Sequence, residues 1–156
     1  MALLSTSVAT LARETQNFDA HWLFQKSDAP GGELNDFDDA AWRKLDLPHD
    51  WSIEGPFAET NLTGGAGAFL PSGLAWYRKH FSLPETESGK SVTIEFDGVM
   101  QNSDVWINGF HLGHRPNGYV SFSYELTGHL NFGGDNVIAV RAVTGSSPMG
   151  RIKFKK

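Results

Sequence analysis

Three carboxylates lie close together near the middle of the chain, and paired carboxylates can act as a general acid and base. The candidates are Glu95, Asp97 and Asp104. Hydrolytic pairs of this kind lie about 5 to 9.5 Å apart across a cleft. Asp97 precedes a glycine at the end of an expected strand, where aspartate usually hydrogen-bonds its own backbone. Glu95 alternates with Ile94 and Phe96 and should face solvent. The sequence therefore predicts structural roles for these side chains and assigns no catalytic residue.

The histidines do not follow a pattern typical of a metal or nucleophilic site. They are His21, His49, His80, His111, His114 and His129. No two lie four residues apart beside a glutamate, and only His111 and His114 flank a predicted turn, so we expect no metal and no cofactor. His49 precedes Asp50, which leaves two interpretations: an acid–base pair, or a hydrogen-bonded corner beside a proline turn. Gly64–Gly67 lacks the lysine and helix of a phosphate-binding loop.

Elements that could position these groups are short β-strands separated by turns. We predict strands over residues 18–25, 74–83, 91–98, 104–108, 110–113, 119–125 and 136–143. Residues 38–43 are predicted to form one helical turn, and residues 52–73 a long loop that is either functional or a disordered insertion. Roughly eight strands at intervals of about ten residues are typical of a sandwich or jelly roll. We therefore predict an all-β fold, a jelly-roll β-sandwich.

The segment 94–109 has the clearest local pattern. The side chains predicted to point into the core from this region are Val92, Ile94, Phe96, Val105 and Ile107. The segment ends at Asn108-Gly109, which favours a type I′ turn. We interpret it as the core hairpin of the sandwich. Trp22, Trp76 and Trp106 lie on predicted strands and are expected to be buried.

Two further tryptophans, Trp42 and Trp51, lie near turns. Each could belong to the core or could stack against a sugar ring.

Composition and charge exclude several function classes. The chain has 156 residues, 40% of them hydrophobic, and a formal net charge of -5. This length suffices for one domain with a buried core. A net negative charge gives no electrostatic reason to expect nucleic acid or an anionic membrane as a partner. Cysteine is absent, which excludes a disulfide framework and thiolate chemistry.

The first residues of the chain are not predicted to belong to the folded domain. Residues 2–12 are apolar but short and interrupted by Ser and Thr, which is too short for a membrane span. We expect residues 1–16 to be a flexible leader or the remnant of a signal peptide. The protein would be periplasmic or extracellular in the second case and cytoplasmic otherwise, so localisation stays unknown.

Six sequence blocks follow one another in a fixed order. They are LPHDWSIEGPF (47–57), GLAWYRK (73–79), EFDGV (95–99), DVWING (104–109), Gly118-Tyr119 with Phe122, and NVIAVR (136–141). Their order and spacing, from about Phe18 to Val143, resemble the N-terminal sugar-binding domain of glycoside hydrolase family 2. This is the family of β-galactosidases and β-glucuronidases.

The resemblance implies a galactose-binding-domain-like sandwich over residues 17–143. In the family this domain is followed by an immunoglobulin-like domain and a TIM barrel, and the barrel supplies both catalytic glutamates. Neither glutamate falls in the part that this chain resembles. The chain alone is therefore expected to be inactive.

The resemblance also implies one contact with substrate. Residues 60–63, Thr-Asn-Leu-Thr, resemble a family loop whose asparagine reaches the barrel's active site. This implies that Asn61 contacts the sugar, because a carboxamide can donate to one hydroxyl and accept from another. The alternative is a solvated loop asparagine with no such partner.

After Val143 the chain departs from the family. Val143 occupies the place of an acidic residue that reaches the sugar, and the closing strand of the family is expected to be missing. The chain thus resembles a product truncated after about Val143, with a divergent basic tail over residues 144–156. The tail could add a short edge strand or be disordered. An open sheet edge would allow self-association.

Three functions follow from these observations. The first is a non-catalytic sugar-binding or accessory domain of a β-galactosidase-like glycoside hydrolase. The alternatives are a free-standing carbohydrate-binding module and a protein-interaction β-sandwich. The expected partner is a β-galactoside or related glycan, bound weakly by the isolated chain, with no nucleic acid and no membrane.

Overall fold

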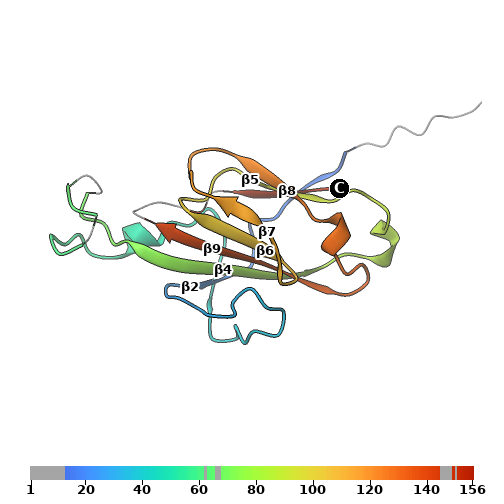
Figure 1. Cartoon of the computed structure of the whole chain (residues 1–156), viewed down its shortest axis with the longest axis horizontal. Coiled ribbons are helices and arrows are strands. Elements are labelled where there is room, and N and C mark those ends of the chain that lie inside the picture. The colour runs from blue at the N-terminus through green and yellow to red at the C-terminus, as the bar shows by residue number, and fades with distance from the viewer. Residues whose placement is uncertain (1–12, 62, 66–67, 145–148, 150) are drawn as a thin grey trace, which may run out of the picture.

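The chain forms two β-sheets that pack face to face around one apolar core (Figure 1). The computed structural model describes residues 13–61, 63–65, 68–144, 149 and 151–156. Sheet A has the strand order β1 (Thr15–Asn17), β10 (Ile152–Lys155), β5 (Thr93–Phe96) and β8 (Phe122–Glu125). Sheet B has the order β3 (Arg43–Leu45), β2 (Trp22–Gln25), β4 (Gly73–Ser82), β9 (Asp135–Thr144), β6 (Ser103–Ile107) and β7 (Phe110–Arg115).

The pairings between these strands are antiparallel. Short 3-10 turns lie in some of the connections, among them η1 (Trp51–Glu54), η3 (Glu85–Glu87) and η4 (Thr127–His129). The predicted all-β, jelly-roll β-sandwich is therefore confirmed. Within the described residues, no helix has the length and apolar character that crossing a membrane requires.

The core follows the alternation of side chains along the strands. All five side chains predicted to point inward are fully buried: Val92, Ile94, Phe96, Val105 and Ile107. Burying each such side chain stabilises the fold by about 1.5–3 kcal/mol. Ile94 and Phe96 belong to β5 in sheet A, while Val105 and Ile107 belong to β6 in sheet B. The two sheets thus contribute facing halves of one core.

The predicted core hairpin over residues 94–109 is wrong in its pairing. Strands β5 and β6 lie in different sheets, so the residues between them cross from one layer to the other. The hairpin that does form joins β6 to β7, and Asn108 (φ 50°) and Gly109 (φ 80°) close it with the positive φ angles of a type I′ turn. A period of two shows which face is buried but not which sheet the strand joins.

Two local predictions near the N-terminus also need correction. Residues 38–43 form no helical turn; a single turn closed by Trp42 N–H and Asp39 O (2.9 Å) leads into β3. The Asp39 carboxylate instead accepts a hydrogen bond from Arg78 at 2.6 Å. The strand predicted over residues 18–25 begins only at Trp22, because His21 has a φ of 62°.

Strand β1 begins in the predicted leader, at Thr15, and ends at the first residue of the predicted range 17–143, while β10 lies beyond the end of that range. Strand β1 pairs with β10, and β10 pairs with β5. Of the two possibilities for the tail, the structure shows a strand, but it lies inside sheet A and not at its edge. Ile152 and Phe154 are buried in the core.

The closing strand that we expected to be missing is therefore present between β1 and β5. Self-association through the remaining edges stays a prediction. Residues 1–12 of the leader, residues 145–148 and 150 of the tail, and residues 66–67 of the glycine loop lie outside the described residues.

Candidate functional site

The segment between η1 and β4 extends beyond the ends of the sheets (Figure 1). We call residues 55–72 the arm. Its described backbone is closed by turns: Phe69 N–H donates to Gly64 O at 2.8 Å, and Ala58 N–H donates to Phe69 O at 3.2 Å. The predicted long loop is thus folded back on itself.

Asn61 is part of the bonding that holds the arm together. Its Nδ2 donates to Phe69 O at 2.6 Å and to Pro56 O at 3.2 Å. Thr63 Oγ1 donates to Leu70 O at 2.6 Å and closes the same loop. Both amide hydrogens of Asn61 are therefore used within the chain. Its carboxamide oxygen accepts no hydrogen bond from a described residue, so this oxygen can accept one from a ligand.

Exposed apolar side chains gather at the end of the sandwich that carries the arm. Phe57 and Ile53 are 71% and 67% exposed in and beside the arm. Tyr119 and Val120, which are 80% and 59% exposed, lie in the connection between β7 and β8. Strand β4 begins at this end and β8 begins there as well, while β7 and β9 end there. Such exposure is typical of a surface that contacts another molecule or domain.

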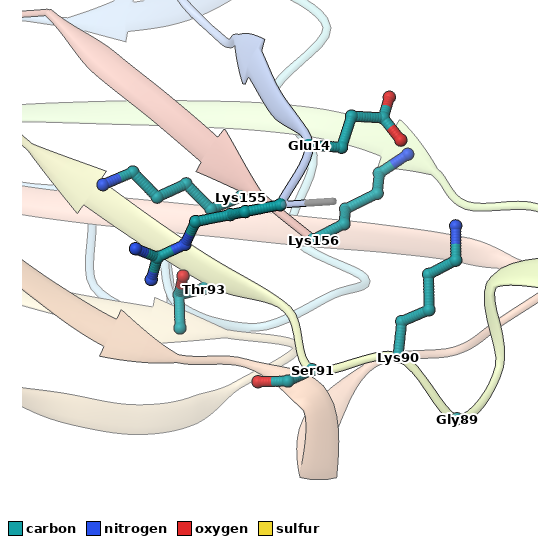
Figure 2. A pocket seen from close by; sticks show the side chains of 8 residues that line it. Glu14, Gly89, Lys90, Ser91, Thr93, Lys155 and Lys156 are labelled. Atoms are coloured by element: carbon teal, nitrogen blue, oxygen red, sulfur yellow. The ribbon is translucent and has the colours of Figure 1, made fainter. Parts of the chain in front are cut away.

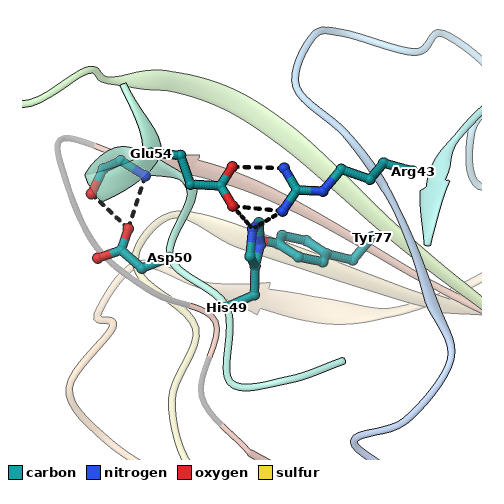
Figure 3. Close-up of polar contacts among 6 residues, drawn as sticks. Arg43, His49, Asp50, Glu54 and Tyr77 are labelled. Atoms are coloured by element: carbon teal, nitrogen blue, oxygen red, sulfur yellow. Dashed lines mark hydrogen bonds and ion pairs between the residues drawn. The ribbon is translucent and has the colours of Figure 1, made fainter. Parts of the chain in front are cut away.

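A corner of four polar side chains anchors the base of the arm (Figure 3). Arg43 donates to both oxygens of Glu54 through Nη1 (2.7 Å) and Nη2 (2.5 Å). Glu54 Oε1 lies 3.1 Å from His49 Nε2, and His49 Nδ1 lies 2.9 Å from the hydroxyl of Tyr77. This corner joins β3, η1 and β4. It fixes the direction in which the arm leaves the sandwich.

The protonation states in the corner follow from its geometry. The hydrogen bonds from Arg43 lower the pKa of Glu54 to about 2. Burial raises the pKa of Tyr77 well above its usual value, so the phenol keeps its proton and shares a hydrogen bond with His49 Nδ1. Because the ionised carboxylate of Glu54 can only accept, the hydrogen bond with His49 is donated by Nε2–H.

Asp50 has a different role from the one that an acid–base pair would require. Its carboxylate accepts from the backbone N–H of Ser52 at 3.0 Å and from the Ser52 hydroxyl at 2.6 Å. This caps η1. The acid–base interpretation of His49 and Asp50 is therefore wrong, and the hydrogen-bonded corner is confirmed.

Each of the three carboxylates considered for catalysis is paired with basic side chains. Glu95 pairs with Lys155, and Asp97 Oδ1 lies 3.2 Å from Lys153 Nζ. Both belong to sheet A or its edge, whereas Asp104 lies on β6 of sheet B. These carboxylates therefore do not face one another across a cleft.

Asp104 brings two of the histidines together. Its Oδ1 lies 3.0 Å from His111 Nε2 and 3.2 Å from His114 Nδ1. Among the described residues, no group of three or more His, Asp or Glu side chains is arranged to hold a metal ion.

Of the tryptophans near turns, Trp51 belongs to the core between the sheets, and Trp42 is buried in a second apolar cluster with Trp76. Trp51 and Trp42 are only 2% and 8% exposed, so neither offers a face to a sugar. Trp76 is also buried, as predicted. Trp106, expected to be buried, is only partly buried and stacks on Trp76 with 5.4 Å between ring centroids.

A crevice lies where β1, β10 and the start of β5 meet, and lysines surround it (Figure 2). Lys156 Nζ lies 3.1 Å from Glu87, and Lys90 Nζ lies 3.2 Å from the same carboxylate. Lys155 pairs with Glu95. The acidic partners offset most of this positive charge, so the crevice does not form a strong anion site.

Several of these residues were not identified from the sequence. Arg43 and Tyr77 lie far from Glu54 along the chain, and no local pattern pairs them. Arg141 of β9 faces outward between the buried Val140 and Ala142. The alternation of Arg141 with these two apolar residues in the sequence was the signal that could have shown its outward position.

Comparison with known proteins adds independent information. Residues 43–150 match the family described as "Glycosyl hydrolase 2 galactose-binding domain-like". A β-galactosidase of Bacteroides ovatus is 48% identical over 147 residues, which are 94% of this chain and 17% of that protein. A putative β-glucuronidase of Formosa agariphila is 42% identical over 86% of this chain and 13% of that protein.

Solved structures agree with the sequence comparison. A glycosyl hydrolase family 2 member from Bacteroides cellulosilyticus superposes with a TM-score of 0.86 at 38% identity. The match covers 91% of this chain and 20% of that one. The chain thus spans only a small part of the proteins that it matches.

Proposed function

We propose that this chain is the non-catalytic accessory domain of a β-galactosidase-like enzyme. The premise is that the chain belongs to the galactose-binding-like domains of glycoside hydrolase family 2. In such an enzyme the reacting carboxylates would come from another part of the polypeptide. The domain would hold the arm at the substrate and contribute one contact from it. Substrate class rests on the relatives' names, of which one is a β-galactosidase and one a putative β-glucuronidase.

The single observation that carries the proposal is the bonding of Asn61 in the arm. Because Nδ2 is held by two backbone carbonyls, the side chain is fixed before any ligand arrives. A sugar hydroxyl can then donate to the carboxamide oxygen, which accepts no hydrogen bond from the described residues, without the entropic cost of ordering that side chain. One such hydrogen bond contributes about 0.5–1.5 kcal/mol, so the isolated chain should bind sugar weakly.

A domain exchange tests this role. The matching 147-residue region of the B. ovatus β-galactosidase would be replaced by this chain, and hydrolysis of a chromogenic β-galactoside measured. We expect an active hybrid whose kcat/KM falls by about two- to tenfold on Asn61→Ala, which corresponds to the loss of one hydrogen bond.

Asn35→Ala is the matched control, because Asn35 is an exposed loop asparagine outside the arm. Equal kcat/KM for the Asn61→Ala hybrid and its parent would refute the contact. A folded but inactive hybrid would contradict the accessory role, and hydrolysis by the purified chain alone would contradict the claim that it is non-catalytic.

A further inference from the structure

A hollow on the outer face of sheet B gathers an indole and several polar side chains. It is lined by Glu33, Trp76, Asp104, Trp106, His111 and Arg141. Residues directly opposite each other in neighbouring strands share one face of a sheet. Trp76 of β4 lies opposite Arg141 of β9, and Arg141 lies opposite Asp104 of β6. Strand register thus brings these side chains to one surface.

A β-bulge completes the hollow. His111 and His114 are three residues apart in β7, and in a regular strand they would point to opposite faces. The register between β6 and β7 shifts between Val105 and Trp106, and the extra residue returns both imidazoles to one side. His111 lies beside Trp106, with 5.1 Å between ring centroids.

The hollow contains hydrogen-bonding capacity that the fold does not use. Between the described residues, no hydrogen bond involves the Glu33 carboxylate, the Trp106 indole N–H or the Arg141 guanidinium. Arg141 Nη1 lies 4.0 Å from Asp104 Oδ2, beyond hydrogen-bonding distance. The Arg141 side chain is 32% exposed. Donors and acceptors therefore converge around a partly buried aromatic ring, which is how polar ligand sites are built.

This combination selects one class of ligand. A sugar ring has C–H faces that pack on an indole and hydroxyls that both donate and accept. The lining contains two carboxylates, Glu33 and Asp104, and one guanidinium, Arg141, and this excess of carboxylates over guanidinium disfavours an anionic sugar. We propose that this hollow binds a neutral hexopyranoside, and that it does so independently of Asn61.

NMR titration of the isotope-labelled chain tests the proposal. The probe is methyl β-D-galactopyranoside, and the readout is the Trp106 indole N–H resonance, assigned with Trp106→Phe. We expect a saturable shift in the millimolar range, as for a small ligand on a shallow site. Glucuronate should bind at least tenfold more weakly.

Variants separate this site from the arm. Arg141→Gln and Glu33→Gln should each weaken the response several-fold, while their amide spectra stay native because both side chains lie at the surface. Lys44→Gln is the charge-matched control: it removes one positive charge from the exposed edge strand β3, outside the hollow, and should change nothing.

Asn61→Ala should leave the Trp106 shift intact, even if it abolishes the contact made by the arm. The proposal is overturned if no saturable shift occurs, if Arg141→Gln and Glu33→Gln both bind like the parent chain, or if Asn61→Ala removes the response.

Discussion

Phe154→Ala tests whether the last strand belongs to the core. Phe154 is 1% exposed in β10. Its ring stacks on Phe18 with 5.1 Å between centroids and meets Phe81 edge-on at 5.6 Å. Truncating a buried phenylalanine typically costs about 3–5 kcal/mol, because it removes apolar contacts and leaves a cavity. Domains as a whole are stable by only about 5–15 kcal/mol, so this loss should be large.

The assay is urea unfolding followed by tryptophan fluorescence. We expect the midpoint to fall while the slope m stays constant, and the melting temperature to drop by roughly 6–20 °C, at about 2–4 °C per kcal/mol for a domain of this size. Lys153→Ala is the control on the same strand. Lys153 points outward to Asp97, and exposed pairs of this kind contribute about 0–1 kcal/mol. Equal, small losses for both variants would refute the packing of β10 into sheet A.

Two further predictions concern ion pairs. Glu54→Gln should destabilise the chain by about 1 kcal/mol at pH 7, since the pair with Arg43 is bidentate but the Glu54 side chain is 39% exposed. The pKa of Glu54 falls from 4.5 to about 2 on folding, so this contribution is present above pH 4.5 and disappears as the pH falls toward 2. Thermal unfolding of the parent chain and the variant across that pH range checks it. A difference in melting temperature that does not change with pH would contradict it. Arg78→Met should cost about 3–5 kcal/mol, because Arg78 is fully buried and its loss leaves the carboxylate of Asp39 without its main partner. Adding Asp39→Asn should recover part of the loss in the same urea assay, and no recovery would show that Arg78 acts mainly through packing.

Local patterns predicted the parts of the fold that depend on neighbouring residues. The buried face of β5 and β6 follows from a period of two, and Asn108-Gly109 specifies its own turn. Strand partners depend on contacts between residues far apart in the chain, so the division of β5 and β6 between two sheets had no local signal. The alternation of Ile152 and Phe154 with lysines was visible, but nothing in four residues shows that a strand will be central.

Some residues of the candidate site could likewise be predicted from the sequence, and others could not. Asn61 came from the resemblance, and the structure adds that its amide hydrogens are engaged by the arm itself. The sequence suggested a hydrogen-bonded corner at His49 but did not identify all of its members, because Arg43 and Tyr77 belong to other strands. The hollow at Trp106 depends on a bulge in β7, and no sequence pattern distinguishes a bulged strand from a regular one.

The pairing of β1 with β10 affects how the protein is made. Thr15 lies opposite Lys155, so the ribosome must release almost the whole domain before sheet A can close. Until then β5 has no hydrogen-bonded neighbour on one side, and the core lacks the side chains of Ile152 and Phe154. Nascent chains with exposed apolar strands of this kind are prone to aggregate and are typical clients of chaperones. Yield in a cell should therefore depend on translation speed and chaperone supply as much as on the stability of the finished sandwich.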